Sequence, residues 1–170
     1  ETFQLLKNNV LNRWVENRID GDQLQDKFNF LGFDFRDMNR YQACVIAWRN
    51  PREHKLTGAE EHFRSFAIHN AIDEALTAEK TGFAFINSDR QVVCVFTSKD
   101  HDEQAFSKRN QAWMTEKASH MALALKTPWF CTLGSVCQHY EQVHNSYKEA
   151  LHLQHYLTYT ESIICTDSST

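Results

Sequence analysis

The chain has 170 residues, of which 42% are hydrophobic and 24% charged, and a formal net charge of −4. This length suits one globular domain with a real hydrophobic core. The 18 Lys and Arg residues are scattered rather than gathered into a stripe, which argues against a grip on nucleic-acid phosphates by this segment. No apolar run approaches the roughly 18 residues of a membrane span, and no signal-peptide pattern is visible. We therefore expect no membrane association and a cytoplasmic location.

The first 36 residues predict two helices. Phe3, Leu6, Val10 and Trp14 recur at helical spacing within residues 2–18. Asp22 is placed to cap a second, shorter helix over residues 23–31, which Gly32 ends. A set of aromatic residues around its end predicts an apolar lid: Phe28, Phe30, Phe33 and Phe35. We treat residues 1–36 as an N-terminal helical extension.

From residue 41 onward, the sequence alternates between strand and helix patterns. Residues 41–48 predict a strand, and residues 56–76 a long helix with a broad apolar face of Phe63, Phe66, Ala67, Ile68, Ala71, Ile72 and Ala75. On the same helix His62, His69, Glu60, Glu61, Asp73 and Glu74 are expected on polar faces. Residues 82–86 and 92–96 predict a hairpin whose turn is Asn87–Arg90. A helix over residues 102–125, a strand after Pro128, a final helix and an edge strand at 162–165 follow.

The order of these elements defines the predicted fold. Read from Tyr41, it is β-α-β-β-α-β followed by a helix and an edge strand. This is the ferredoxin-like α+β plan, an antiparallel sheet with helices packed on one face. We expect residues 37–166 to form one compact domain. Fold alone does not give function, since cyclases, RNA-binding domains and small-molecule sensors share this plan.

Five cysteines, an odd number with no C-x-x-C pair, indicate structural thiols rather than a metal or disulfide framework. They are Cys44, Cys94, Cys131, Cys137 and Cys165. Three of them fall inside predicted strands, so we expect reduced, buried thiols. Because the chain begins at Glu1 rather than Met, we also expect it to be a segment of a longer protein.

The final helix carries the most suggestive side chains. Val143, Tyr147, Ala150, Leu151 and Gln154 share one helical face, which predicts that Tyr147 packs on the sheet and that Ala150 allows close approach. Ser146 near the helix start is expected to bond free backbone amides, because neither G-x-S-x-G nor S-x-x-K is present.

Three histidines lie on one flank of this helix. His152 and His155 are weak candidates for metal binding, and they would need an outside ligand. His144 lies roughly 12 Å along the axis from His152, too far to share an ion. The alternative, a solvated helix surface, is the stronger interpretation.

Several segments together resemble one family. The opening helix, FLGFDF, YQACVIAW, VVCVF and NSYKEALHL, taken in order, resemble the middle domain of YesN-type response regulators of the AraC class. Sugar-diacid and purine-catabolism regulators carry a similar domain, a degenerate relative of the GGDEF diguanylate cyclase domain. The resemblance covers nearly the whole chain.

The parts that a cyclase needs are missing from the sequence. Phosphoryl transfer needs Mg²⁺ held by carboxylates and backbone amides around the phosphates. In GGDEF enzymes the motif sits on the hairpin between the second and third core strands, which here is Asn87–Arg90, with one acid and no glycine pair. The other carboxylate would come from the end of the first strand, here Ala47–Asn50. We therefore expect no catalytic residues, no metal and no cofactor.

The resemblance implies a regulatory role in transcription. We expect a non-enzymatic signal-relay domain of a bacterial two-component regulator, with a phosphoacceptor receiver domain before it and helix-turn-helix motifs after it. DNA would be bound through the other domain only. A small-molecule-sensing domain of a sugar-acid-type regulator is one alternative, favoured by any pocket between the Phe-rich extension and the sheet. An active nucleotide cyclase is the other.

A homodimer is the expected assembly. Phe3, Leu6, Val10 and Trp14 have the 3-4-4 spacing of a helix-pair seam, which could transmit a signal between domains. The competing interpretation is that these residues bury against the sheet of their own chain. The sequence leaves both open.

Overall fold

The computed structural model describes residues 2–35, 37–48, 58–125, 129–156 and 165–167. The elements, in chain order, are α1 (Thr2–Val15), α2 (Gly21–Leu31), β1 (Arg40–Trp48), α3 (Gly58–Glu79), β2 (Gly82–Ile86), β3 (Val92–Ser98), α4 (Glu103–Leu125), β4 (Trp129–Leu133), the short helix η1 (Tyr140–Gln142), α5 (Val143–Tyr156) and β5 (Cys165–Asp167). The predicted sequence of elements is confirmed. The edge strand begins at Cys165, and the earlier part of its predicted range, 162–164, lies outside the described residues.

The five strands form one sheet in the order β2-β3-β1-β4-β5. β3 pairs antiparallel with both β1 and β2, and β4 pairs antiparallel with β1, which gives the predicted ferredoxin-like plan. β5 adds a parallel edge next to β4. The central strand β1 carries alternate side chains to the two faces, so both faces need a cover.

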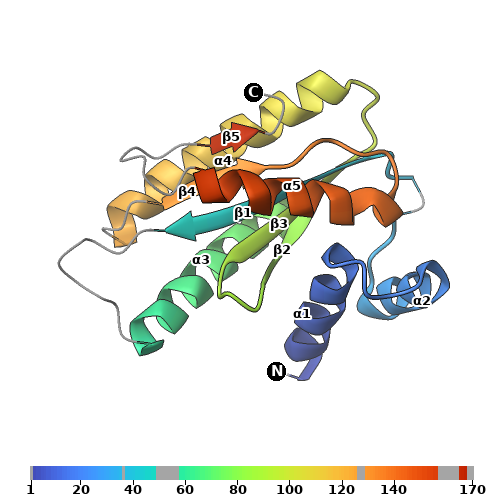
Figure 1. Cartoon of the computed structure of the whole chain (residues 1–170), viewed down its shortest axis with the longest axis horizontal. Helices are drawn as coiled ribbons and strands as arrows, with labels where there is room; N and C mark the ends of the chain where they lie inside the picture. Colours follow the sequence, from blue (N-terminus) through green and yellow to red (C-terminus); the bar gives the residue numbers. More distant parts are fainter. Residues whose placement is uncertain (1, 36, 49–57, 126–128, 157–164, 168–170) are drawn as a thin grey trace.

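Helices cover both faces of this sheet (Figure 1). On one face α3 and α4 bury Ile68, Ile72, Leu76, Phe106 and Met114 against Cys44, Ile46 and Cys94. On the other face α1, α2 and α5 bury Val10, Trp14, Phe28, Val143 and Tyr147 against Ala43, Val45 and Phe83. The final helix and the extension therefore occupy the face opposite α3 and α4, and the structure is a three-layer arrangement.

The predicted aromatic lid forms, with one exception. Phe28 and Phe35 are buried, Phe33 is partly buried and stacks on Phe83 with ring centroids 4.9 Å apart, and Phe30 is 69% exposed. Gly32 ends α2 in the left-handed conformation at φ 80°, as predicted. Asp20 rather than Asp22 occupies the N-cap position, and its side chain makes no capping bond.

On the face opposite α3 and α4, close contacts hold α5 against the strands β1 and β4. The Ser146 hydroxyl accepts a hydrogen bond of 2.9 Å from the amide of Ala43, and the Thr132 hydroxyl donates one of 2.8 Å to the carbonyl of Ala150. A Cβ atom added to Gly134 would lie 1.9 Å from the Ser146 carbonyl oxygen, so only glycine fits there. Ser146 thus bonds a strand amide rather than the helix start.

Two predictions about α3 were wrong. Phe63 and Phe66 are 65% and 52% exposed, whereas His69 is 5% exposed and buried. The helix turns the stripe of Ser65, Ile68, Ile72 and Leu76 to the sheet, and His69 lies beside that stripe near β2. A broad apolar pattern on a helix does not say which part of it faces the core, because the tertiary contact selects the stripe.

The Gly134 contact yields a stability prediction. Gly134→Ala should lower the free energy of unfolding by about 2–3 kcal/mol, because the methyl group must push α5 away from the sheet. Urea unfolding followed by circular dichroism measures this. Gly58→Ala is the matched control, since its Cβ would meet only Arg90 Nη1 at 3.9 Å, and its stability should be unchanged or slightly raised. Equal stability of both variants would contradict the close docking of α5.

Candidate functional site

The β2–β3 hairpin, where GGDEF enzymes carry their motif, is closed by its own side chain. Asn87 Oδ1 accepts hydrogen bonds from the amides of Asp89 and Gln91, at 3.0 and 2.9 Å. The amides of Asn87 and Arg90 bond the carbonyls of Gln91 and Asn87 in turn. Four amides of the turn, those of Asn87, Asp89, Arg90 and Gln91, are thus already used within the turn.

Two helices also hold this hairpin. The Ser65 hydroxyl on α3 donates to the Arg90 carbonyl at 2.7 Å, and the Arg90 guanidinium donates to the carbonyl of Gly58. On the other side Asn87 Nδ2 donates to the Tyr147 hydroxyl of α5 at 3.2 Å. Burial raises the pKa of Tyr147, and the bond from Asn87 partly offsets that effect. The hairpin is a structural joint between α3 and α5.

A metal site does not assemble among the described residues: they hold no group of three or more His, Cys, Asp or Glu that could bind an ion. Asp89 is the one acid on the hairpin. Arg49 and Asn50, at the end of the first strand, lie outside the described residues. The weak candidates His152 and His155 are both exposed near the end of α5.

The outer edge of β2 is capped by side chains from α1 and α3. Asn8 bonds both the amide and the carbonyl of Ile86 at 2.9 Å, and Asn12 Nδ2 donates to the same carbonyl at 2.8 Å. From α3, Asp73 accepts from the amide of Ala84, and His69 Nε2 donates to the Ala84 carbonyl. The outward backbone groups of Ala84 and Ile86 are therefore satisfied, which blocks pairing with another strand along this part of the edge.

The four residues of the predicted dimer seam lie in different environments. Val10 and Trp14 are 1% and 3% exposed inside the chain's own core, Leu6 is partly buried against it, and Phe3 is 53% exposed. Trp14 Nε1 also donates to the carbonyl of Tyr140 at 2.7 Å, which joins α1 to the start of α5. Of the seam, Phe3 and part of Leu6 remain on the surface.

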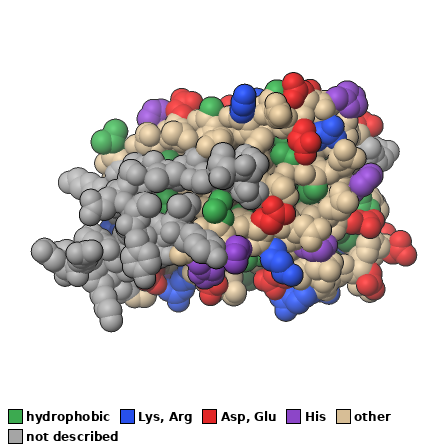
Figure 2. Space-filling model, turned by 45° about the horizontal axis from the view of Figure 1, so that its top comes forward, with side chains coloured by type: hydrophobic (Ala, Val, Ile, Leu, Met, Phe, Trp, Pro, Cys, Tyr) green, Lys and Arg blue, Asp and Glu red, His purple; other side chains and the backbone are tan. Residues whose placement is uncertain are grey.

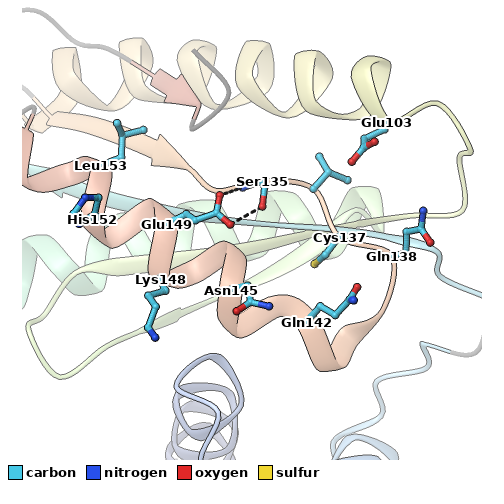
Figure 3. Close-up of a pocket in the computed structure, with 11 residues that line it drawn as sticks. Glu103, Ser135, Cys137, Gln138, Gln142, Asn145, Lys148, Glu149, His152 and Leu153 are labelled. Atoms are coloured by element: carbon cyan, nitrogen blue, oxygen red, sulfur yellow. Dashed lines mark hydrogen bonds between the residues drawn. The ribbon is translucent and has the colours of Figure 1, made fainter.

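A groove of about 880 Å³ lies between α5, the β4–η1 segment and the start of α4 (Figure 3). Its walls come from Glu103, Ser135, Val136, Cys137, Gln138, Gln142, Asn145, Lys148, Glu149, His152 and Leu153. Glu149 fixes one wall, since its carboxylate accepts from the Ser135 hydroxyl at 2.7 Å and from the Ser135 amide at 3.2 Å. A second hollow shares Glu103, Ser135 and Val136 and extends the groove toward Gln42 and Lys108.

Charged side chains of both signs line the groove: Glu103, Glu149 and Lys148. Burial raises the pKa of the Cys137 thiol to about 12, and the carboxylates of Glu149 and Glu103 add to the rise. Both carboxylates therefore act on the same wall. In Figure 3 the Glu149 side chain is directed toward Ser135, and Glu103 at the start of α4 and Lys148 on α5 also line the groove.

This groove is not where the sequence suggested a pocket. The space between the Phe-rich extension and the sheet is filled by rings of Trp14, Phe28, Phe35 and Phe83, with centroids 4.5–5.8 Å apart. The thiols partly match their prediction: Cys44, Cys94 and Cys131 are buried thiols outside any disulfide, whereas the Cys137 thiol is only partly buried. The side chain of Cys165 lies outside the described residues.

Charged side chains are scattered over the surface, as the sequence predicted. On the face shown in Figure 2, acidic, basic and histidine side chains are interspersed, with no large patch of one sign. None of the described helices has the length and apolar character needed to cross a membrane.

The sheet order, the hairpin and the docked final helix define a cyclase-like α+β domain. The chain matches the GGDEF-like domain family over residues 16–156, and it belongs to that family. The match begins after α1, so α2 lies inside the family domain and α1 precedes it. The comparison with curated proteins finds no match.

Sequence reasoning missed three features of this site. The closure of the hairpin by Asn87 was signalled by the Asn at its first position, since Asn side chains commonly bond backbone two residues on. The edge caps Asn8 and Asn12 stand four apart on α1, and their partner strand could not be read from sequence. The groove arises from the path of residues 134–138, for which no sequence signal exists.

Proposed function

We propose that this GGDEF-like domain is a non-catalytic signal-relay domain of a bacterial transcription regulator. One observation carries the proposal. The hairpin that bears the cyclase motif in GGDEF enzymes is held here by hydrogen bonds that involve Asn87, Ser65 and Tyr147. A substrate phosphate at this turn would have to displace bonds that hold α3 and α5 in place. The single acid Asp89 also leaves the hairpin short of a two-carboxylate metal site.

The structure offers a path for relay between the first and last helices. Asn8 and Asn12 of α1 hold Ile86, the neighbouring Asn87 holds Tyr147 of α5, and Trp14 bonds Tyr140. A shift of α1 must therefore move the hairpin or α5, because these bonds and the shared core leave few alternative registers.

The wider setting follows from the resemblance to YesN-type regulators. In this proposal a receiver domain in the same longer chain precedes α1, and helix-turn-helix motifs follow α5 and contact DNA. The domain itself works as a homodimer in the cytoplasm, without contacting DNA or membrane.

Incubation with GTP and Mg²⁺ tests the central claim. The purified chain should form no cyclic dinucleotide above the background of a protein-free control, with product followed by chromatography. Turnover that Asp89→Ala abolishes would overturn the proposal, because Asp89 is the only acid on the hairpin.

A double-mutant cycle tests the relay path. Asn8→Ala and Tyr147→Phe should be non-additive in free energy of unfolding by about 0.5–1 kcal/mol, because Asn8 bonds the backbone of Ile86 and Tyr147 bonds the side chain of the next residue, Asn87. Asn8→Ala with Thr115→Ala on α4 is the control pair and should be additive. If the effects of Asn8→Ala and Tyr147→Phe on the free energy of unfolding add within error, α1 and α5 are not coupled and the relay path is wrong.

Association through the start of α1 can be tested at its exposed residues. Phe3→Asp should shift a concentration-dependent dimer toward monomer in analytical ultracentrifugation without lowering the melting temperature, since Phe3 is outside the core. A short helix pair gives only modest association. Phe63→Asp, at a 65% exposed phenylalanine on α3, is the matched control and should leave the profile unchanged. A monomeric parent chain, or equal effects of both variants, would rule this dimer out.

Small-molecule sensing is the second candidate function, and the groove beside α5 favours it. Its size lies within the range of about 300–1,000 Å³ that is usual for ligand sites. A ligand there would touch α4 and α5 together, and it would influence the helix that leads toward the output end.

A further inference from the structure

Two cysteines face each other across neighbouring inner strands of the sheet. β1 and β3 pair antiparallel, and their register places Cys44 directly opposite Cys94. Both side chains belong to the hydrophobic cluster beneath α3 and α4, so the two sulfur atoms lie on the same face of the sheet. Both residues are reduced thiols in the structure.

This pairing brings the two residues within the reach of a disulfide. Directly opposite residues of an antiparallel pair have Cα atoms about 4.5–5.5 Å apart, and a disulfide joins Cα atoms about 4.4–6.8 Å apart. The Cβ atoms of such a pair are about 4.5–5.5 Å apart, whereas a disulfide brings them to about 3.5–4.5 Å. The backbone spacing therefore already fits, and only a small approach of the two Cβ atoms is needed.

The third buried thiol of the same cluster stands farther away. Cys131 lies on β4 opposite Ile46, which places it diagonally to Cys44. Diagonal neighbours in a sheet are about 7–8 Å apart, beyond the usual span of a disulfide. Cys94 is two strands away from Cys131, because β1 lies between β3 and β4. Among these three thiols the sheet therefore selects Cys44 and Cys94 as the pair that can be joined.

Burial decides when this pair can react. Cys44 and Cys94 are both 0% exposed, and α3 and α4 cover their face of the sheet (Figure 1). The thiolate is the reactive form of cysteine, and apolar burial disfavours it. An oxidant therefore reaches the pair only when α3 or α4 moves off this face, an opening of the kind that proteins make locally without unfolding as a whole.

We propose that Cys44 and Cys94 are a redox-sensitive pair, which closes to a disulfide between β1 and β3 when the cover of α3 and α4 opens in the presence of a small disulfide oxidant. The bond ties the two strands together until a thiol reductant opens it again. In a reducing cytosol it forms only under oxidative conditions. The inference goes beyond signal relay and ligand sensing and depends on neither.

The reaction is a thiol–disulfide exchange in two steps. One cysteine thiolate attacks the oxidant, forms a mixed disulfide and releases one small thiolate. The other cysteine thiolate attacks the protein sulfur of that mixed disulfide and releases the second small thiolate. The protein loses two electrons and two protons, and the S–S bond of the oxidant becomes two thiols.

Incubation of the purified chain with glutathione disulfide tests the pair, in buffer and at urea concentrations below the unfolding transition. Remaining thiols are alkylated in denaturant, and tryptic peptides are analysed by mass spectrometry without reduction. Trypsin places Cys44 in residues 41–49, Cys94 in 91–99 and Cys131 in 127–148, so each link has its own mass. The peptide that joins 41–49 to 91–99 should be the main linked product among these three, should increase with urea below the transition and should disappear with dithiothreitol.

Alanine variants separate the pair from the third thiol. Cys44→Ala and Cys94→Ala should each abolish the linked peptide. Cys131→Ala, which removes a thiol from the same core, is the matched control and should keep the parent yield. Circular dichroism checks that each variant folds, and the change is mild because a buried Cys behaves as a small hydrophobe. The parent chain carries the main result without any substitution.

Three outcomes would overturn the inference. The first is absence of the 41–49 to 91–99 link at every urea concentration below the transition. The second is an equal yield of peptides that join Cys131 to Cys44 or Cys94, because it would show random pairing in an opened chain. The third is linkage in buffer as fast as in fully unfolded protein, because the cover of α3 and α4 would then not control the reaction.

Discussion

The docking of α5 onto the β1–β4 pair is the contact on which the rest of the structure depends. Gly134 lets the Ser146 backbone approach, and the Ser146 hydroxyl then satisfies the Ala43 amide that β4 leaves open. Because a buried amide without a partner costs about 1–3 kcal/mol, this bond also fixes the rotation of α5 about its axis. That rotation brings Tyr147 to the hairpin, Val143 to the aromatic core and Glu149 to the groove.

The closed edge of β2 explains how α1 belongs to the fold although it precedes the family domain. Edge strands invite pairing with other chains, and proteins usually block them. Here the block is made of amide, carboxylate and imidazole side chains from two helices, so α1 is held by directional bonds as well as by Val10 and Trp14. The salt bridge of 3.2 Å between Lys7 and Asp73 ties the two capping helices together. These bonds explain why an apparent extension shares a core with the domain.

The sequence predicted the elements well because their signals are local. The strand of residues 41–48, the hairpin and the helix ending at Gly32 each carry periodicity or turn chemistry that needs no partner. Sequence-based prediction failed where the burial of a side chain depends on a contact with a distant segment of the chain. His69 looked solvent-exposed because its acceptor, the Ala84 carbonyl, belongs to a strand 15 residues away in sequence. Phe63 and Phe66 looked buried because helical spacing alone cannot say where the sheet ends. The same holds for the site. The sequence alone showed that Asp89 is a lone acid on the hairpin, whereas the groove could be found only from the three-dimensional path of residues 134–138.

The bonds made by the turn amides and the rigidity of the hairpin are linked. A turn that binds phosphate must leave its amides unpaired until a ligand arrives, which costs stability in the free protein. In this chain Asn87 Oδ1 accepts from the amides of Asp89 and Gln91, and its Nδ2 group donates to Tyr147, so the hairpin joins the sheet to α5. α5 is then held from one side by the hairpin and α1 and open to the groove on the other.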